Sequence, residues 1–600
     1  MSSLLERGRS HSCGELRLPD AGSRVALFGW VHRRRDLGAR IFVQLRDREG
    51  ITQISFAEEI DAEAYAIAST LRLEDCIGIS GVVVDRGDNV NKEMATGAIE
   101  VAGDSIEVFS RAETPPFVVA DDDRLDAQEN LRLKYRYLDL RRPSLQRNFK
   151  IRSQIAYITR RTLNDHGFYE LETPYMVKYT PGGARNFLVP SRLHPGMFYA
   201  LAESPQIYKQ LFMVAGMDKY FQICRCFRDE DLRNDRQPEF TQIDVELSFA
   251  TPTRVAEPME ALMVSLWKEV LGQDIERPFL RLPWDEAMSR FGSDKPDMRF
   301  GVELVDVTDI TRGSGFAVLD AAEAVVGLAV PPSHAAPLSR SRMDKIVELA
   351  KARETGGAKG LLWGKIGDDG KLTGALTKNV PAAMQEAIVA KLGAAPGSVV
   401  MFVADAKSTA RTVMGNLRLH LRDELSLLPD KRESKFLWVT DFPLFEKNDK
   451  GNFVSAHHPF TSPRLEDLEL LESDPGRVRA QAYDLVLDGN EIGGGSIRIH
   501  RSDVQARVFK ALGLSDEDAQ AKFGFLLEAF KYGPPPHGGI ALGLDRVAMI
   551  MCGASSLRDV IAFPKTQRGQ DLMTVCPTPA DDPQLEELYI THRPLPQRSE

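Results

Sequence analysis

The sequence predicts a multidomain protein of mixed α and β structure, and three observations support this. Its 600 residues, 43% hydrophobic and 27% charged, have an ordinary globular composition, and the length allows roughly three to five domains. Short segments of alternating polarity fill residues 24–109, as expected for a small β-barrel. Two longer β-rich runs within 220–249 flank a polar loop, which predicts an antiparallel hairpin in a second domain.

The N-terminal part of the chain is predicted to form a β-barrel. A helical stretch at Asp61–Leu71 lies between the third and fourth of five expected strands. Five strands with one helix in this place predict an OB-fold over residues 1–110, a barrel that often binds single-stranded nucleic acid. The expected strands are Val25–Val31, Ile41–Leu45, Ile51–Phe56, Cys76–Val84 and Ala98–Val108.

A hinge is expected at residues 111–145. Thr114, Pro115 and Pro116, followed by acidic residues, interrupt both periodicities there. Beyond the hinge, Phe149–His166 has helical spacing, and Phe168–Thr173 is predicted to be a strand that ends before a proline.

The remaining chain is predicted to form one domain in two parts, 146–286 and 426–600. Residues 287–425 differ in composition from their flanks, with Ala-rich helices and Gly-rich turns, and are interpreted as an inserted α+β domain. Near the end of the second part, Gly539–Met551 is predicted to begin with glycines and continue as an apolar helix.

Charge and cysteine content exclude several classes of protein. The net charge of −10 does not indicate general nucleic-acid binding, so such binding would depend on local clusters such as Arg33–Arg35. The six cysteines contain no CxxC pair, which argues against zinc and against a disulfide framework. Cys224 and Cys226 are interpreted as core residues of a strand. Without an apolar leader or a long apolar run, a cytoplasmic protein without membrane contact is expected.

Three segments concentrate unusual residue types: GFYELETP (167–174), FRDEDLRNDRQPEFTQID (227–244) and GIALGLDR (539–546). Together they resemble the three motifs of class II aminoacyl-tRNA synthetases, whose catalytic domain is built on an antiparallel sheet. Four further segments narrow the resemblance to bacterial aspartyl-tRNA synthetases over nearly the whole chain. They are SPQIYKQ (204–210), AHHPFTSP (456–463), GNEIGGGSIRIH (489–500) and RDVIAFPKT (558–566).

The resemblance implies an ATP site. Arg228 would bind the α-phosphate and the amino acid's carboxylate, because its planar guanidinium suits two-pronged anion binding. Glu230, expected on the same strand face as Arg228, would read the adenine amino group, while Phe240 would stack beneath the ring. A surface salt bridge between Arg228 and Glu239 is the alternative. The remaining implied contacts are Asp229, Gln237 at the γ-phosphate, Gly543, Leu544, Asp545, and Arg546 at the outer phosphate.

A magnesium site is implied by two acids. Asp484 and Glu491 resemble the carboxylates that hold Mg²⁺ against the phosphates, and carboxylate oxygens are the ligands such an ion prefers. Three glycines at 493–495 would let a ligand approach closely. Merely solvated acids at strand ends are the alternative.

The family places Lys209 and Arg498 around the side-chain carboxylate of aspartate. We expect a buried pair of cations to be unfavourable without an anion, which argues for an acidic substrate over asparagine. Asp244 would hold the substrate's ammonium or orient Arg498. The other residues implied in this subsite are Ser204, Gln206, Ile207, Tyr208 and His457.

One departure from the family concerns the segment TPGGARNF (180–187). Bacterial relatives commonly carry Glu where this chain has Gly182. That carboxylate meets the substrate ammonium, and our hypothesis is that Glu203 takes over part of this role.

In the barrel, the resemblance implies contacts with the tRNA anticodon. Phe42 would stack on a base, Gln53 and Glu100 would read base edges, and Arg35 would contact the backbone or a base. The resemblance also implies that Leu37 and Asp88 bear on tRNA specificity. A leucine at position 37 resembles the residue found in enzymes restricted to tRNA-Asp.

The expected activity is therefore that of a homodimeric aspartate–tRNA ligase with Pro174 near the dimer interface. It would use L-aspartate, ATP with Mg²⁺, and tRNA-Asp; charging of tRNA-Asn as well stays open. Two alternatives are a non-catalytic tRNA-binding paralogue and an asparaginyl- or lysyl-type synthetase.

Overall fold

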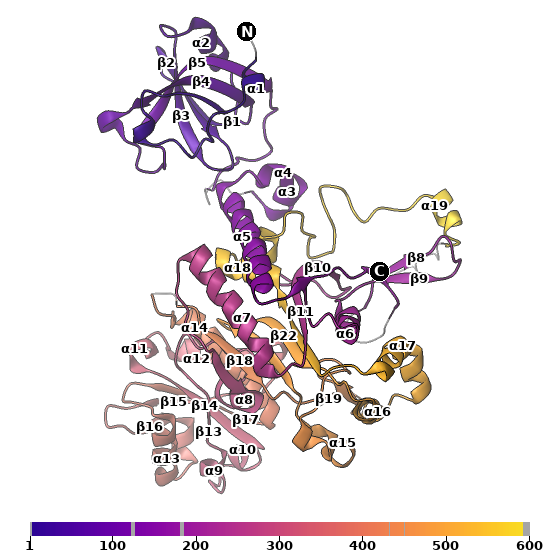
Figure 1. Cartoon of the computed structure of the whole chain (residues 1–600). Helices are drawn as coiled ribbons and strands as arrows, with labels where there is room; N and C mark the ends of the chain where they lie inside the picture. Colours follow the sequence, from indigo (N-terminus) through magenta and orange to yellow (C-terminus); the bar gives the residue numbers. More distant parts are fainter. Residues whose placement is uncertain (1–2, 122–126, 180–184, 431–432, 449, 592–600) are drawn as a thin grey trace. The chain divides into compact units, whose positions relative to one another are not determined.

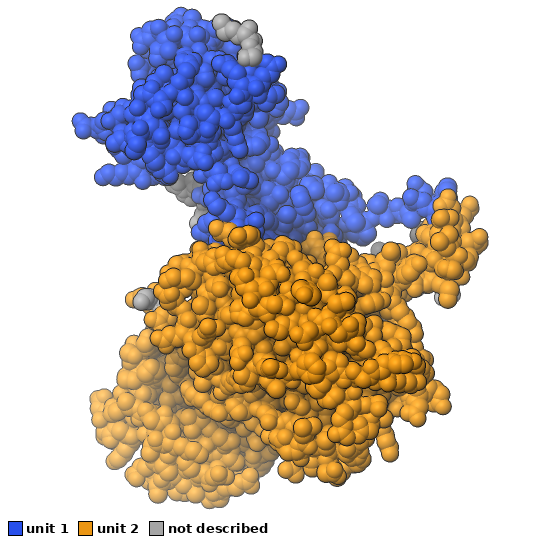
Figure 2. Space-filling view, viewed as in Figure 1, with its two compact units in different colours: residues 1–153, 231–238, 548–584 blue, residues 154–230, 239–547, 585–600 orange. Residues whose placement is uncertain are grey.

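The computed structural model describes residues 3–121, 127–179, 185–430, 433–448 and 450–591. The chain forms two compact units, shown in different colours in Figure 2, and neither is a single stretch of sequence. Unit 1 comprises residues 1–153, 231–238 and 548–584, and unit 2 comprises 154–230, 239–547 and 585–600.

A closed five-stranded barrel in the order β1-β2-β3-β5-β4 begins unit 1, which confirms the predicted OB-fold. Alternate residues such as Val31, Val43 and Ile54 fill its interior because successive side chains of a strand point to opposite faces. Its helix α2 (Ala62–Ser69) begins after the capping side chain of Asp61. The strands are β1 (Arg24–Asp36), β2 (Arg40–Arg46), β3 (Ile51–Ala57), β4 (Cys76–Asp85) and β5 (Ile99–Ser110).

A buried carboxylate joins the barrel to the helices that follow it. Glu74 accepts two hydrogen bonds from Arg46, at 2.7 and 2.9 Å, and a third from Arg141 at 2.8 Å. Arg141 also lies 4.7 Å from the ring centroid of Trp30. The helices of this part are α1 (Leu4–Arg7), α3 (Glu129–Lys134), α4 (Arg136–Asp139) and the start of α5 (Pro143–Asp165).

Unit 2 is built on an eight-stranded sheet (Figure 1). Its central pairings are antiparallel, as predicted, and both edge strands pair in parallel. The predicted strand at Phe168–Thr173 is reduced to the two residues of β6. In spatial order the strands are β12 (Leu280–Pro283), β18 (Phe436–Thr440), β21 (Ala482–Leu487), β22 (Asn490–Ile497), β23 (His537–Gly543), β11 (Glu239–Ser248), β10 (Lys219–Phe227) and β6 (Tyr169–Glu170).

The prediction of a glycine-led helix from Gly539 is wrong in its first part. Gly539 lies within strand β23, and helix α18 begins only at Leu544. This strand carries glycine at Gly539 because neighbouring side chains and main chain occupy the space in which a Cβ would lie. Helices that accompany this sheet are α6 (Gln206–Val214), α7 (Pro252–Leu266), α8 (Trp284–Phe291), α15 (Leu470–Ser473), α16 (Ser502–Ala511), α17 (Asp516–Ala529) and α18 (Leu544–Cys552).

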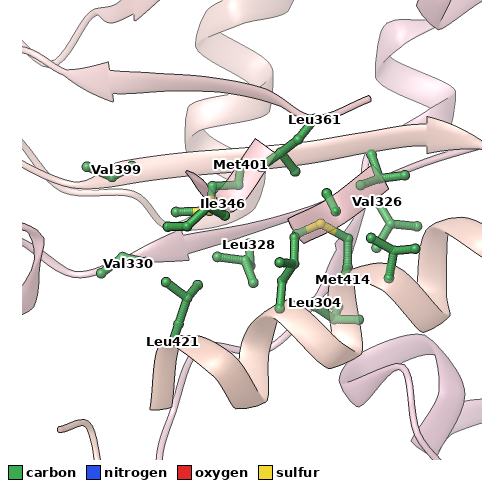
Figure 3. Close-up of a cluster of buried hydrophobic side chains, with 14 of the residues drawn as sticks. Leu304, Val326, Leu328, Val330, Ile346, Leu361, Val399, Met401, Met414 and Leu421 are labelled. Atoms are coloured by element: carbon green, nitrogen blue, oxygen red, sulfur yellow. The ribbon is translucent and has the colours of Figure 1, made fainter. Parts of the chain in front are cut away.

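Residues between α8 and β18 form a second sheet with its own core, in the order β13-β14-β17-β15-β16. Figure 3 shows Met401 and Leu328 of this sheet close to Met414 of helix α14, within one cluster of buried apolar side chains. The elements are β13 (Val305–Asp306), β14 (Ala324–Val330), β15 (Leu362–Ile366), β16 (Leu372–Gly374), β17 (Val399–Asp405), α9 (Thr308–Thr311), α10 (Ala317–Asp320), α11 (Pro332–Ala335), α12 (Arg340–Lys351), α13 (Ala382–Leu392) and α14 (Lys407–Glu424).

Two small sheets and a C-terminal helix complete the structure. They comprise β7 (Met176–Val177), β8 (Leu188–Pro190) and β9 (Phe198–Leu201), then β19 (Phe445–Lys447) and β20 (Phe453–Ser455), and α19 (Asp582–Glu587). Over the described part of the chain, every helix is too short or too polar to cross a membrane.

Removing the Glu74 carboxylate should destabilise unit 1. In Glu74→Ala the buried Arg46 loses its carboxylate partner and keeps only neutral acceptors such as the Val119 carbonyl. Breaking a buried ion pair in this way typically costs roughly 3–5 kcal/mol. We expect earlier melting by calorimetry and faster hydrogen exchange in the barrel strands. Glu59→Ala is the matched control, because the Arg40–Glu59 pair is exposed and should contribute no more than about 1 kcal/mol. Equal effects of the two substitutions would contradict the proposed role of Glu74.

Candidate active site

One face of the large sheet carries the predicted site residues. Asp484 of β21 pairs with Gly494 of β22, which pairs with Ala541 of β23, which in turn pairs with Asp244 of β11. Directly paired residues point to the same face of a sheet, so the two aspartates flank a floor made of glycine and alanine.

A second row lies beside the first. Glu246 pairs with Gly539, and Gly539 pairs with Ser496. A Cβ on Gly539 would lie 2.1 Å from Glu246 Oε2, and one on Gly494 would lie 2.6 Å from Asp484 Oδ1. Both glycines therefore leave the space in which carboxylates lie across the floor.

Two buried cations converge on this floor. Lys209 of helix α6 places Nζ 3.0 Å from Asp244 Oδ2 and 3.3 Å from Glu246 Oε2. Arg498, just after β22, donates to both oxygens of Glu246, at 3.1 and 3.2 Å, and to Ser496 Oγ at 2.7 Å. All four charged residues are at most 5% exposed. The structure thus joins Lys209 to Arg498 through a single carboxylate.

The expectation that the Lys209–Arg498 pair requires a bound acid is wrong. Asp244 and Glu246 supply two negative charges beside the two positive ones, so the cluster is neutral by itself. Glu246 was not identified from the sequence. The sequence feature that could have identified Glu246 is its position two residues after Asp244 on the same strand, which places both side chains on one face.

Burial and the cations set the protonation of this cluster. Burial raises the pKa of Asp244 to about 6, although Lys209 opposes this shift. For Glu246, burial acts in the same direction, but Arg498 and Lys209 outweigh it and hold its pKa below the ordinary value. Burial and the same two cations lower the pKa of His458 to about 3, so this imidazole is neutral. Burial also lowers the pKa of His457.

Three buried polar atoms of the predicted substrate residues have no hydrogen-bond partner among the described residues. They are the acceptor Asp244 Oδ1 and the donors Gln206 Nε2 and Arg228 Nε. Buried polar atoms are normally paired, so the acceptor and the donors indicate a ligand with both positive and negative groups.

Strand β10 ends at Phe227, so Arg228 and Glu230 lie beyond it. The prediction that Arg228 and Glu230 lie on one face of a strand is therefore wrong. Arg228 lies over Phe240, 5.0 Å from the ring centroid. Glu239 is paired with Arg225 at 3.7 Å, rather than with Arg228 as the alternative required. The main-chain N–H of Asp229 donates to the carbonyl of Arg185.

Asp484 and Glu491 lie close together because of a β-bulge. The register of β21 and β22 shifts between Leu485 and Val486, and this shift brings Glu491 to the face of Asp484. A Cβ on Gly494 would lie 3.5 Å from Glu491 Oε1, near the same point as Asp484 Oδ1. Burial, then the charge of Glu491, raises the pKa of Asp484 well above its ordinary value. Two repelling carboxylates of this kind fit a divalent cation.

The start of helix α18 adjoins this pair. Arg546 Nη1 donates to the Glu491 carbonyl at 2.5 Å, and Asp545 Oδ2 accepts from the Thr241 N–H at 2.7 Å. Gly543 is the last residue of β23 and Leu544 the first of the helix. Asp545 therefore connects α18 to strand β11.

The other predicted substrate residues lie on or before helix α6. Ser204, Gln206, Tyr208 and Glu203 are partly exposed, whereas Ile207 packs against a cluster of phenylalanines that includes Phe460. Helical spacing thus turns the Ile207 side chain away from Lys209, which contradicts a side-chain contact with the substrate. Gly182 lies outside the described residues.

Gln237 belongs to unit 1, with the loop 231–238. Its side-chain amide donates to the carbonyl of Lys565 at 3.1 Å and accepts from the Lys565 N–H at 2.8 Å. The structure therefore shows a positioning role for this side chain within unit 1.

The predicted anticodon residues lie on the outer face of the barrel. Arg35 pairs with Phe42 across β1 and β2, and Gln53 donates to Glu100 at 2.9 Å. Arg35 is exposed and Phe42 half-buried. Leu37 and Asp88 are both exposed.

The cysteine prediction holds in part. Cys224 and Cys226 are buried, with their sulfur atoms 3.9 Å apart, as expected for core residues. The described residues contain no group of three or more His, Cys, Asp and Glu side chains able to hold a metal ion.

An OB-fold barrel joined to an antiparallel sheet with this charged face defines a class II tRNA synthetase. Residues 128–567 match the family model "tRNA synthetases class II (D, K and N)", and residues 25–109 match "OB-fold nucleic acid binding domain". The chain belongs to this class II family. An "Aspartate--tRNA(Asp/Asn) ligase" of Anaeromyxobacter dehalogenans is 53% identical over 98% of both chains. An "Aspartate--tRNA ligase" of Ruminiclostridium cellulolyticum is 49% identical over 97% of this chain and 98% of its own.

Solved structures show the same fold at low identity. The aspartyl-tRNA synthetase of Entamoeba histolytica has a TM-score of 0.57 at 19% identity, covering 94% of this chain and 93% of its own. The asparaginyl-tRNA synthetase of Pyrococcus horikoshii complexed with asparaginyl-adenylate also scores 0.57, at 19% identity, covering 93% and 98%.

The raised pKa of Asp244 predicts a pH-dependent stability. Its folded-state value of about 6 exceeds the ordinary 3.8, so its stabilising contribution is complete below pH 3.8 and is lost as pH rises through 6. Between about pH 4.5 and 6.5 the melting temperature of the wild type should therefore fall relative to that of Asp244→Asn.

Glu246→Gln provides a control of opposite sign. The pKa of Glu246 is lowered, so its contribution is present above the ordinary value of 4.5 and is lost at lower pH. The assignment would be contradicted if the melting temperature of Asp244→Asn ran parallel to the wild type between about pH 4.5 and 6.5, or if that of Glu246→Gln ran parallel to it below pH 4.5.

Proposed function

We propose that the protein is an aspartate–tRNA ligase, which activates L-aspartate with ATP and transfers it to the 3′ end of tRNA-Asp. The printed names of relatives 49–53% identical over nearly the full length support this. The observation that carries the proposal is the set of unpartnered atoms in the predicted substrate residues, together with the buried cluster of Lys209 and Arg498.

Aspartate offers the groups that these atoms lack. Its ammonium would donate to Asp244 Oδ1, while one carboxylate would accept from Gln206 Nε2 or Arg228 Nε. The side-chain carboxylate would bind Arg498 and Lys209. Arg498 uses three of its five donors on Glu246 and Ser496, which leaves two for this second anion. Glu203 remains our candidate for part of the ammonium binding, with Ser204, Tyr208 and His457 around the substrate.

In the first step, the α-carboxylate attacks the α-phosphate of ATP and pyrophosphate leaves. Arg228 would hold both reacting groups, and Arg546 would bind the outer phosphates, so that catalysis comes from positioning and charge neutralisation. Asp484 and Glu491 would hold Mg²⁺, which would neutralise phosphate charge when bound. Glu230 and Phe240 are proposed for the adenine, since Phe240 is partly exposed although Arg228 lies over its ring. Asp229 and Gln237 are proposed for the same nucleotide.

In the second step, the terminal ribose hydroxyl of tRNA attacks the activated carbonyl, without a covalent enzyme intermediate. The barrel would bind the anticodon through Arg35, Phe42, Gln53 and Glu100. A cytoplasmic homodimer with Pro174 near its interface completes the proposal. Leu37 favours tRNA-Asp alone, whereas the relatives' names include both the Asp and the Asp/Asn forms, so charging of tRNA-Asn stays open. Aminoacylation of tRNA-Asp and tRNA-Asn transcripts side by side tests it.

The activity is tested by ATP–pyrophosphate exchange with aspartate, asparagine or lysine. We expect exchange with aspartate alone. Exchange with asparagine or lysine in its place, or none with any amino acid, would reject the proposal in favour of another synthetase or a non-catalytic paralogue.

A methyl group on Gly539 should disable aspartate use. In Gly539→Ala the new Cβ would lie 2.0 Å from the Val245 carbonyl oxygen and 2.1 Å from Glu246 Oε2, so it would shift strand β11 and displace Glu246 from between the two cations. A misplacement of about 1 Å can reduce activity on the order of 100-fold, so we expect a loss of this size in kcat/KM for aspartate with little change in the KM for ATP. Gly360→Ala is the control, because nothing lies within 4 Å of its Cβ. Parallel losses for both substrates would indicate general misfolding instead.

Phe42→Ala should weaken tRNA binding alone. Loss of one stacked base typically costs about 1–3 kcal/mol, so the KM for tRNA-Asp should rise roughly tenfold or more in aminoacylation. Pyrophosphate exchange, which needs no tRNA, should be unchanged. Phe28→Ala is the matched control: Phe28 is also half-buried on the outer barrel face, but it packs edge-on against Phe109. A normal KM for Phe42→Ala would exclude the stacking role.

A further inference from the structure

A buried ionic network lies where residues 287–425 join the large sheet. Asp297 is fully buried and accepts from Arg299 Nε at 2.9 Å, Arg299 Nη2 at 2.7 Å and Arg422 Nη1 at 2.9 Å. Beside it, Arg418 donates to the carbonyls of Asp297 and Val302, both at 2.8 Å. These bonds fix the loop between α8 and β13 to helix α14.

Arg299 extends this network to the turn between β21 and β22. Its Nη1 lies 3.7 Å from Asp488 Oδ2, and its Nη2 donates to the Asp488 carbonyl at 3.4 Å. Gly489, the next residue, packs so closely that a Cβ there would lie 3.0 Å from Asp297 Cβ. Asp488 and Gly489 both have positive φ, 53° and 81°, in a two-residue hairpin turn. The far side of the turn is bonded to Lys435, whose N–H donates to Asp488 Oδ1 at 2.9 Å.

This turn leads directly to one of the two proposed metal ligands. Glu491 is three residues after Asp488, at the start of β22, and lies before the bulge that orients it toward Asp484. Its carbonyl is held by Arg546. The backbone of Glu491 therefore has little freedom as long as the turn is fixed by Arg299.

We propose that Asp297 and Arg299 are positioning residues for the metal–nucleotide site. They fix the β21–β22 turn and, through it, the carboxylate of Glu491, so that the inserted segment 287–425 sets the affinity for the divalent cation that accompanies a nucleoside triphosphate. This inference rests on the proposed function of Asp484 and Glu491.

The test is Mn²⁺ binding followed by electron paramagnetic resonance in the presence of a non-hydrolysable ATP analogue, with neither aspartate nor tRNA. For Arg299→Met we expect the affinity for Mn²⁺ to fall roughly tenfold, the size of effect typical of residues that orient metal ligands. Arg299→Lys, which keeps one charge near Asp488, should recover part of the loss. Calorimetric titration with aspartate should give wild-type affinity for both variants.

Arg290→Met is the matched control. Arg290 lies in the same segment and binds Glu303 through two hydrogen bonds, at 2.9 and 2.8 Å, but it is partly exposed and pairs with Glu286 and Glu303 instead of the turn. It should bind Mn²⁺ normally. Unchanged Mn²⁺ affinity in Arg299→Met, or an equal loss of aspartate affinity, would overturn the positioning role. A wild-type protein that binds no Mn²⁺ with the analogue would instead reject the proposed nucleotide site itself.

Discussion

The shared carboxylate of Glu246 is the interaction on which the candidate active site depends. It lies between Lys209 and Arg498 and binds both, while Asp244 balances the remaining charge. Four ionised or ionisable groups could not be buried here without such pairing. The arrangement is possible only because Gly539 leaves the space under the carboxylate empty. The absence of a side chain at Gly539 thus allows Glu246 to lie between the two cations.

Because the cluster of two cations and two carboxylates is neutral, excess positive charge does not explain selectivity for an acidic substrate. In a pocket with unpaired cations, binding would be driven by excess positive charge. In the observed site the cations are already paired, so a substrate would have to use the donors and acceptors that are left over at Asp244, Gln206, Arg228 and Arg498. As proposed, such a site would select a zwitterion with a second carboxylate, because a ligand that lacks one of these groups would leave a buried polar atom unpaired.

Much of the fold could be predicted from the sequence because local patterns determine it. The barrel strands alternate in polarity, and Lys209, Asp244 and Arg498 lie in distinctive motifs. The prediction failed where a residue's environment comes from distant strands: Gly539 resembles a helix start until its neighbours on β11 and β22 are known. Glu246 and Arg299 were missed for the same reason, since no motif distinguishes them and only burial beside charged partners shows what they do. The residues around Gly182 lie outside the described chain, so the predicted substitution by Glu203 stays a prediction.

The joint at Glu74 has a consequence for how the protein can be divided. By topology the barrel ends with β5 at Ser110, yet the second arginine bound to its buried glutamate is Arg141, on the far side of the hinge. The compact unit that contains the barrel also includes two short stretches from much later in the chain. A fragment cut at the topological boundary would therefore retain every strand but leave an acidic side chain short of one counter-charge. A fragment that is to keep this ion pair complete must extend past Arg141.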